Sequence, residues 1–160
     1  MKKNKHLINV CLTSDQLYKY EIENSIVVVI DILRATSVIS TAFHYGIKSI
    51  KPVSTIEEAI SYKKNKDYIC AGERNALPIE ELEYGNSPYQ YMNNEIKGKK
   101  LIITTTNGTN AIKISKNAKM VIIASYININ ACSDFLINQN HNIIFLCSGW
   151  KGFYNLEDSI

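Results

Sequence analysis

Strand-like and helix-like segments alternate along almost the whole chain, and this alternation constrains the fold more than any other feature of the sequence. The run 26 to 31, IVVVID, is apolar without interruption and rich in β-branched residues, as expected for a strand covered on both faces. Apolar residues then recur at helical spacing from Ala35 until Gly46, a natural helix stop. Parallel strands need crossover connections, so the pattern predicts an α/β fold with a mostly parallel sheet flanked by helices.

The same patterns predict the individual elements. Strands are expected at 7 to 12, 26 to 31, 47 to 53, 68 to 71, 101 to 106, 119 to 124 and 142 to 147. Further helices are expected from Ser54 or Thr55 to about Tyr62, from Thr109 to Ser115, from 129 to 136, and from Asn155 onward. Residues 72 to 100 interrupt the rhythm with prolines and glycines, as a functional or disordered connection does. No repeat or linker divides the chain, which predicts a single α/β domain over 1 to 160.

The composition excludes several classes of protein. The 160 residues are 46% hydrophobic and 21% charged, which is typical of a globular domain. The net charge of +3 is spread without blocks of like charge, so no nucleic-acid partner is expected. Residues 1 to 15 lack the pattern of a cleavable leader, and no apolar run approaches the roughly 18 residues of a membrane span. A cytoplasmic protein without membrane contact is therefore expected.

Absent motifs and the positions of the histidines narrow the chemistry further. The sequence has no G-x-x-x-x-G-K-[ST] phosphate loop and no G-x-G-x-x-G fingerprint, which argues against ordinary nucleotide hydrolases and dinucleotide oxidoreductases. His6, His44 and His141 all lie away from the predicted ligand-binding edge. Histidine-dependent triads and zinc sites with several histidines are therefore not expected.

Polar residues cluster where four of the predicted strands end. They are Asp31, Arg34, Thr36 and Ser37; Gly72, Glu73 and Arg74; Thr104, Thr105, Thr106 and Asn107; and Ser148 and Gly149. Because parallel strands end at one edge, where ligands bind in such sheets, these groups are expected to line one crevice. Carboxylates are ligands for Mg²⁺, the arginine fork matches phosphoryl oxygens, and hydroxyls and amides hold anions. The set therefore suits a phosphate ester and a divalent cation.

Each of these groups also has a purely structural explanation. Asp31 could cap the following helix, and TTTNGT could be a strand that runs into an Asn-Gly turn. Glu157 and Asp158 could be favourable charges at the start of a helix. The expected convergence of the groups, rather than any single one, favours a site.

Four segments, in order and over almost the entire chain, match the motifs of a known family. They are VVVIDILRATSVISTAF (27 to 43), AGERNALPIEELEYGNSPYQY (71 to 91), TTTNGTNAI (104 to 112) and LCSGWKGFYNLED (146 to 158). With them the chain resembles the 2-phosphosulfolactate phosphatase family. The resemblance implies an α/β, Mg²⁺-dependent phosphatase that releases phosphate from (2R)-phospho-3-sulfolactate and gives 3-sulfolactate on the route to coenzyme M.

The resemblance also implies roles for single residues. The catalytic candidates are Asp31 and Glu73, and the candidate ligands of Mg²⁺ are Asp31, Glu157 and Asp158. The candidates for binding the substrate and its phosphate are Arg34, Thr36, Arg74, Asn86, Ser87, Thr105, Asn107 and Gly108. Whether a carboxylate or water attacks the phosphorus stays open. The expected partner is a small anionic phosphate ester, and a homodimer is kept as an expectation.

Three departures from the family pattern leave an alternative function open. Glu81, Leu82 and Glu83 stand where the family usually has Gly, Phe and Asp, and Asn110 stands where a basic residue is common. Family domains continue well beyond the LED motif, whereas this chain ends at Ile160, so a fold with its C-terminal part missing is expected. The alternative to the enzyme is a truncated, non-catalytic anion-binding remnant of the fold. A generic nucleotide-binding domain is a third, weaker hypothesis.

Overall fold

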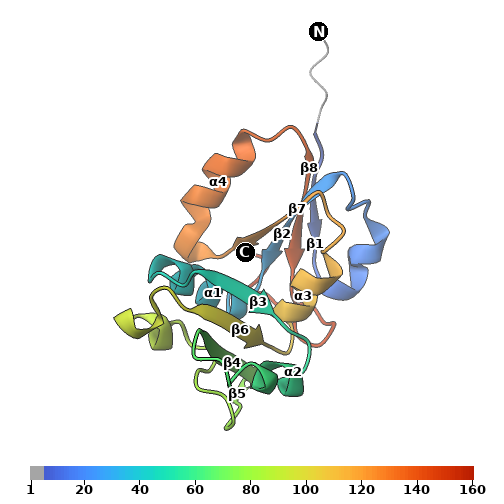
Figure 1. Ribbon diagram of the computed structural model, residues 1–160. Helices are drawn as coiled ribbons and strands as arrows, with labels where there is room; N and C mark the ends of the chain where they lie inside the picture. Colours follow the sequence, from blue (N-terminus) through green and yellow to red (C-terminus); the bar gives the residue numbers. More distant parts are fainter. Residues whose placement is uncertain (1–5) are drawn as a thin grey trace.

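The computed structural model describes residues 6–160 and shows an α/β protein whose strands form two four-stranded sheets (Figure 1). The first sheet is parallel throughout, in the order β1-β8-β2-β7. Its strands are β1 (Ile8–Cys11), β8 (Asn142–Cys147), β2 (Ser25–Ile30) and β7 (Met120–Ala124). Strand β2 lies between two neighbours and is buried over nearly its whole length, which explains its uninterrupted apolar sequence.

The second sheet has the order β3-β6-β4-β5. Its strands are β3 (Ser49–Pro52), β6 (Lys100–Thr104), β4 (Tyr68–Arg74) and β5 (Leu77–Pro78). Strands β3, β6 and β4 are parallel, whereas the short β5 folds back antiparallel on the end of β4. The whole second sheet is formed by residues between β2 and β7, so it is an insertion into the path of the first.

Two helices connect the sheets and form the layer between them (Figure 1). Helix α1 (Ala35–His44) leaves the end of β2 and buries Val38 and Ala42 against the second sheet. Helix α3 (Gly108–Ile114) leaves the end of β6 and buries Ala111 against the first sheet. Each helix thus starts at one sheet and packs on the other, which brings the carboxyl ends of both sheets to the middle of the molecule.

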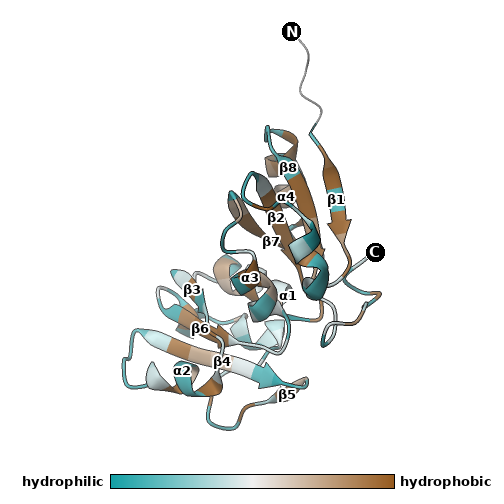
Figure 2. Ribbon diagram, turned by 90° about the vertical axis from the view of Figure 1, so that its right-hand side faces the viewer, coloured by the Kyte–Doolittle hydropathy of each residue, from teal (hydrophilic) through white to brown (hydrophobic). Residues whose placement is uncertain are grey.

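The outer faces of the two sheets are covered by separate helices. Helix α4 (Ile129–Ile137) packs Leu136 on the first sheet, and α2 (Ile56–Ser61) packs Ala59 on the second. Helix α2 begins where the Thr55 hydroxyl accepts a hydrogen bond from the Glu58 amide at 3.1 Å. Short 3₁₀ helices fill the connections: η1 (Ser14–Lys19), η2 (Pro88–Tyr91), η3 (Asn94–Ile96) and η4 (Tyr126–Asn128). Figure 2 shows the apolar residues concentrated in the strands of the first sheet.

The structure confirms the predicted α/β class and its mostly parallel pairing, with three differences of detail. The strands divide between two sheets. Strand β4 extends to Arg74, so Glu73 and Arg74 lie within the strand and not after it. The helix predicted from Asn155 is a turn, because the Asn155 side chain accepts the Asp158 amide at 3.2 Å while the Asp158 carboxylate is held by backbone amides elsewhere.

No helix within residues 6–160 is long and apolar enough to cross a membrane. The prediction that residues 1 to 15 contain no cleavable leader falls partly on residues 1–5, which lie outside the described residues.

Candidate active site

The predicted strand ends meet beside the first turns of α1 and α3, in a region we call the inter-sheet edge (Figure 1). Asp31 follows β2, and Gly108 is the first residue of α3. A Cβ atom at Gly108 would lie 2.6 Å from Asp31 Oδ2 and 2.5 Å from Ala35 Cβ. Only glycine therefore lets α3 come this close to the Asp31 carboxylate.

The Asp31 carboxylate is buried and held from two sides. Its Oδ1 accepts the Ala35 amide at 3.1 Å, and its Oδ2 accepts the Ser148 hydroxyl at 3.3 Å. The pKa of Asp31 is raised to about 6. Burial is the main cause, the negative charge of Asp158 adds to it, and Glu73 makes a smaller contribution. Asp31 thus accepts the first amide of α1, although Arg34 and not Asp31 is the N-cap residue, and its carboxylate has a strongly perturbed pKa.

Asp158 is the second buried carboxylate of the inter-sheet edge. Its Oδ1 accepts the Ile32 amide at 2.9 Å, and its Oδ2 accepts the Gly149 amide at 3.1 Å. Gly149 has a φ of 70°, a left-handed conformation that turns the chain after β8 and aims this amide. Burial raises the pKa of Asp158 despite these two hydrogen bonds. Neighbouring residues, Ser148 and Gly149, therefore hold the two members of one carboxylate pair.

Glu73 is buried near the end of β4 and is fully engaged by the loops around it. Its Oε1 accepts the Thr106 amide at 2.5 Å, and its Oε2 accepts the Thr106 hydroxyl at 3.0 Å and the Ala76 amide at 2.7 Å. The carboxylate thus ties the turn after β6 to the β4–β5 hairpin. Its effect on the pKa of Asp31 shows that it also contributes to the negative field of the inter-sheet edge.

The predicted threonine contacts are buried and hydrogen-bonded within the fold. Thr36 Oγ1 donates to the Asp31 carbonyl at 2.8 Å and accepts the Asp31 amide at 3.1 Å. Thr105 Oγ1 accepts the Thr109 amide at 3.0 Å, while Thr109 Oγ1 donates to the Thr105 carbonyl at 2.9 Å. In the structure these hydroxyls shape the first turns of α1 and α3.

The two arginines are held differently. The Arg74 guanidinium donates to the Glu73 carbonyl at 2.7 Å, the Thr104 hydroxyl at 2.7 Å and the Ser54 carbonyl at 3.3 Å. Arg34 is half-buried just before α1, after a cis peptide bond to Leu33, and its side chain has no hydrogen-bond partner in the part of the chain that the structure describes. Arg74 is therefore fixed in place, whereas Arg34 has its full donor capacity available.

The remaining predicted residues lie close to these strand ends. Asn86 is two residues beyond Tyr84, which forms an isolated parallel bridge with Ala71 of β4. The Asn86 Oδ1 atom is buried without a hydrogen-bond partner in residues 6–160, which is typical of a group that receives a ligand or water. Ser87 follows directly, half-buried. Asn107 Oδ1 accepts the Lys151 amide at 2.9 Å and so joins the turn before α3 to the tail.

Beside the carboxylates lies a pocket of about 330 Å³ that we call the cationic pocket. It is lined by Ser54, Arg74, Thr105, Thr106, Thr109, Asn110 and Lys113. Ser54 and Lys113 were not among the predicted site residues. Ser54 follows β3 and could have been found by the same strand-end argument, but its position before α2 made it a helix cap. Lys113 lies within α3, where periodicity predicts only an exposed face.

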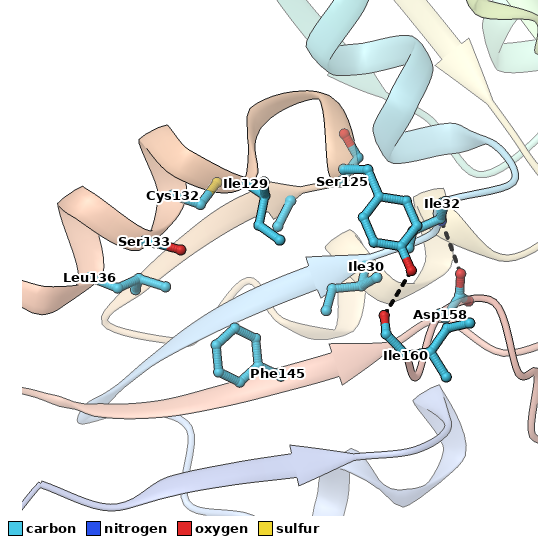
Figure 3. A pocket seen from close by; sticks show the side chains of 12 residues that line it. Ile30, Ile32, Ser125, Ile129, Cys132, Ser133, Leu136, Phe145, Asp158 and Ile160 are labelled. Atoms are coloured by element: carbon cyan, nitrogen blue, oxygen red, sulfur yellow. Dashed lines mark hydrogen bonds between the residues drawn. The ribbon is translucent and has the colours of Figure 1, made fainter.

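A second pocket, of about 130 Å³, lies between α4 and the first sheet and is shown in Figure 3. We call it the apolar pocket. Its walls include Ile30, Ile129, Leu136 and Phe145, and Asp158 lies at its rim (Figure 3). Apart from Asp158, it contains none of the predicted site residues.

The predicted set of metal ligands is only partly brought together. Asp31 and Asp158 form the buried pair, whereas the Glu157 side chain is exposed. Within residues 6–160 no three His, Cys, Asp or Glu side chains form a metal-binding group. The pair nevertheless fits Mg²⁺, which proteins commonly bind through one or two carboxylates together with substrate phosphates. Two buried carboxylates that repel each other are also a site where a cation is favourable.

The fold and the inter-sheet edge define an α/β protein with a paired-carboxylate site at the ends of parallel strands, beside a pocket lined by cationic side chains. The sequence model of the 2-phosphosulpholactate phosphatase family matches residues 11–160. The chain belongs to this family.

Relatives in several bacteria support the same assignment. The chain is 41% identical over 155 residues to a probable 2-phosphosulfolactate phosphatase of Clostridium acetobutylicum, and 43% identical over 155 residues to that of Clostridium tetani. It is 42% identical over 154 residues to the corresponding protein of Caldanaerobacter subterraneus subsp. tengcongensis. The matches cover 96%, 96% and 89% of this chain but 66%, 66% and 64% of the relatives. The chain thus spans just under two thirds of the length of these proteins.

Proposed function

We propose that this chain is a Mg²⁺-dependent phosphatase that hydrolyses 2-phosphosulfolactate to sulfolactate and phosphate, as in coenzyme M biosynthesis. Family membership supports the substrate. The observation that best supports the chemistry is the buried pair of Asp31 and Asp158, held by Ser148 and Gly149 at the ends of parallel strands. Buried carboxylates with raised pKa values are typical of sites that bind a cation or transfer a proton.

Asp31 and Asp158 are the residues that would hold Mg²⁺ in this proposal. When bound, the cation would neutralise charge on the transferred phosphoryl group and help to activate water. Arg34 would bind phosphoryl oxygens, because its side chain has no partner in the described residues and its planar fork matches two of these oxygens. Asn86 would contribute an unpaired side-chain oxygen to a substrate hydroxyl or a bound water.

Other residues of the site have positioning roles. Glu73 holds the turn at Thr106 and adds negative charge near Asp31. Thr36 fixes the backbone of Asp31, and Gly108 leaves space for the carboxylate beside α3. Asp31, with a pKa near 6 before a cation binds, is suited to exchange a proton at neutral pH. Together these residues fix the donors before substrate arrives, which is the main protein contribution to phosphoryl transfer.

The proposal is tested by phosphate release from 2-phosphosulfolactate in Mg²⁺ and in EDTA. We expect release in Mg²⁺ only, and we expect Asp31→Asn to lower kcat/KM by more than about 100-fold, beyond the loss typical of residues that only support a metal ligand. Asp134→Asn makes the same chemical change at an exposed position of α4 and is the matched control. Equal rates in Mg²⁺ and EDTA would exclude the metal role.

The alternative function is an anion-binding protein without turnover. It shares the site but not the reaction, so calorimetry with phosphate and with sulfolactate separates the two. Binding without hydrolysis would support this alternative, and the absence of both binding and hydrolysis would contradict both functions.

A further inference from the structure

Two cationic side chains from different elements meet at one residue of the cationic pocket. Arg74, at the end of β4, donates from Nη2 to the Ser54 carbonyl at 3.3 Å. Lys113, on α3, donates from Nζ to the Ser54 hydroxyl at 3.0 Å. Like charges that converge on one uncharged residue repel each other, and an anion bound between them would remove this repulsion.

Neither cation is neutralised inside the protein. All three hydrogen-bond acceptors of Arg74 are uncharged, two carbonyls and the Thr104 hydroxyl. Within residues 6–160, no carboxylate oxygen lies within 4.0 Å of Arg74 or Lys113. Glu57 is exposed on α2. Hydrogen bonds to the backbone and to Thr55 are the main causes that lower the pKa of Glu57, and the charge of Arg74 makes a smaller contribution. The lining of the pocket itself contains no acidic residue.

The two cations keep donors available for a ligand. A guanidinium has five N–H donors and an ammonium has three, of which the structure uses three on Arg74 and one on Lys113. Because Arg74 is immobilised by three acceptors, little conformational entropy would be lost when its remaining donors bind an anion. The pocket thus has a fixed cation on one side and an adjustable one on the other.

The cationic pocket and the carboxylate pair lie on two sides of the start of α3. Gly108 faces Asp31, and the next residue, Thr109, lines the cationic pocket. On the carboxylate side an anion needs a metal ion as a bridge, whereas on the pocket side N–H donors bind it directly. A small molecule with two anionic groups of different kinds therefore has a distinct place for each.

We propose that the cationic pocket binds the sulfonate of the substrate, which also carries a phosphate and a carboxylate, and that Lys113 and Ser54 determine this specificity together with Arg74. The proposal rests on the proposed function and assigns the phosphate to the carboxylate side. A sulfonate offers three acceptor oxygens and a single negative charge, so donors from Arg74, Lys113 and the Ser54 hydroxyl suffice to bind it without a metal.

The test compares two substrates that differ only in the sulfonate, 2-phosphosulfolactate and 2-phospholactate. We expect Lys113→Gln to raise the KM for 2-phosphosulfolactate relative to the KM for 2-phospholactate about tenfold, because one charged hydrogen bond is lost for 2-phosphosulfolactate only. Ser54→Ala should shift the ratio in the same direction by less. Lys116→Gln, an exposed lysine just beyond α3 and outside the pocket lining, is the matched control and should leave the ratio unchanged.

The outcomes separate this inference from the proposed function. Hydrolysis of both substrates with an unchanged ratio in Lys113→Gln, or the same change in Lys116→Gln, would overturn the pocket assignment and leave the phosphatase intact. If neither substrate is hydrolysed, the phosphatase fails, and calorimetry with sulfolactate and lactate decides the pocket alone. Sulfolactate binding that weakens about tenfold in Lys113→Gln would support the pocket, and equal binding of sulfolactate by the variant, or none by either protein, would overturn it.

Discussion

The apolar pocket and the cationic pocket have opposite linings. The cationic pocket lies at the ends of strands β3, β4 and β6 and contains two positive side chains without carboxylate partners in the described residues. The apolar pocket lies on a face of the first sheet, under α4, and its walls are mainly side chains such as Ile30, Leu136 and Phe145 (Figure 3). The buried Asp158 lines the apolar pocket, whereas the cationic pocket is lined by Thr109, the residue after the Gly108 that faces Asp31. Only the cationic pocket has side chains that could bind an anion.

The difference follows from where each pocket lies on a sheet. On a face, the pleat repeats the same environment every second residue, so side chains there pack as apolar layers. At the ends of strands the chain leaves the sheet, and polar groups reach the ligand from several loops at once. We therefore expect substitutions in the apolar pocket to change stability and substitutions at the strand ends to change binding.

The largest effect on stability is expected from Leu136→Ala in the apolar pocket. Leu136 is 8% exposed and packs with Ile26, Val28 and Ile143, so its truncation should lower the free energy of unfolding by about 2 to 5 kcal/mol. Urea unfolding measures this, and KM should not change. Ile137→Ala, at an 80% exposed position of the same helix, is the control and should stay within about 0.5 kcal/mol. A changed KM in Leu136→Ala would mean that the apolar pocket belongs to the site.

A second prediction concerns the pH dependence of stability and Asp31. The pKa of Asp31 rises from 3.8 to about 6 on folding, so between these pH values the folded state binds more protons than the unfolded state. The contribution of Asp31 to the free energy of unfolding therefore falls as pH rises, by about 3 kcal/mol in total, and the loss is complete at pH 7. Asp31→Asn has no ionisable group at this position, so its free energy of unfolding does not include this decrease.

Urea unfolding in EDTA at pH 4, 5, 6 and 7 measures the effect as a difference between proteins. Relative to wild type, Asp31→Asn should gain up to about 3 kcal/mol of stability across this range while losing activity. Asp134→Asn, exposed on α4, should follow wild type at every pH. If wild type and Asp31→Asn give parallel curves, the buried carboxylate is not the source of the pH dependence.

The smallest of the three effects is expected from Arg34→Lys. Arg34 lies beside the positive start of α1, where a cation is unfavourable unless an anion neutralises both charges. An ammonium cannot make the bidentate contact, so phosphate binding should weaken by about 1.5 to 3 kcal/mol, the value of one charged hydrogen bond. The melting curve should be unchanged, because the side chain makes no hydrogen bond in residues 6–160. Unchanged affinity for phosphate, with an unchanged melting curve, would return Arg34 to a surface role.

Local pattern was sufficient to predict most elements and the place of the site. The β-branched run at 26 to 31 and the helical spacing after Ala35 depend on neighbours within a few residues, and the structure has β2 and α1 there. The convergence of Asp31 with Ser148, and of Glu73 with Thr106, follows from the rule that parallel strands end at a common edge. These are consequences of backbone geometry that any similar sequence shares.

Long-range pairing decided the rest, because periodicity identifies a strand but not its neighbours. The division into two sheets depends on α1 and α3 crossing from one sheet to the other, and no local signal shows this. Tertiary packing likewise separated the adjacent carboxylates Glu157 and Asp158, one exposed and one buried on distant amides. It also brought Lys113 to Ser54, 59 residues earlier in the chain, which made a cationic pocket from a helix face and a loop that sequence alone describes as surface.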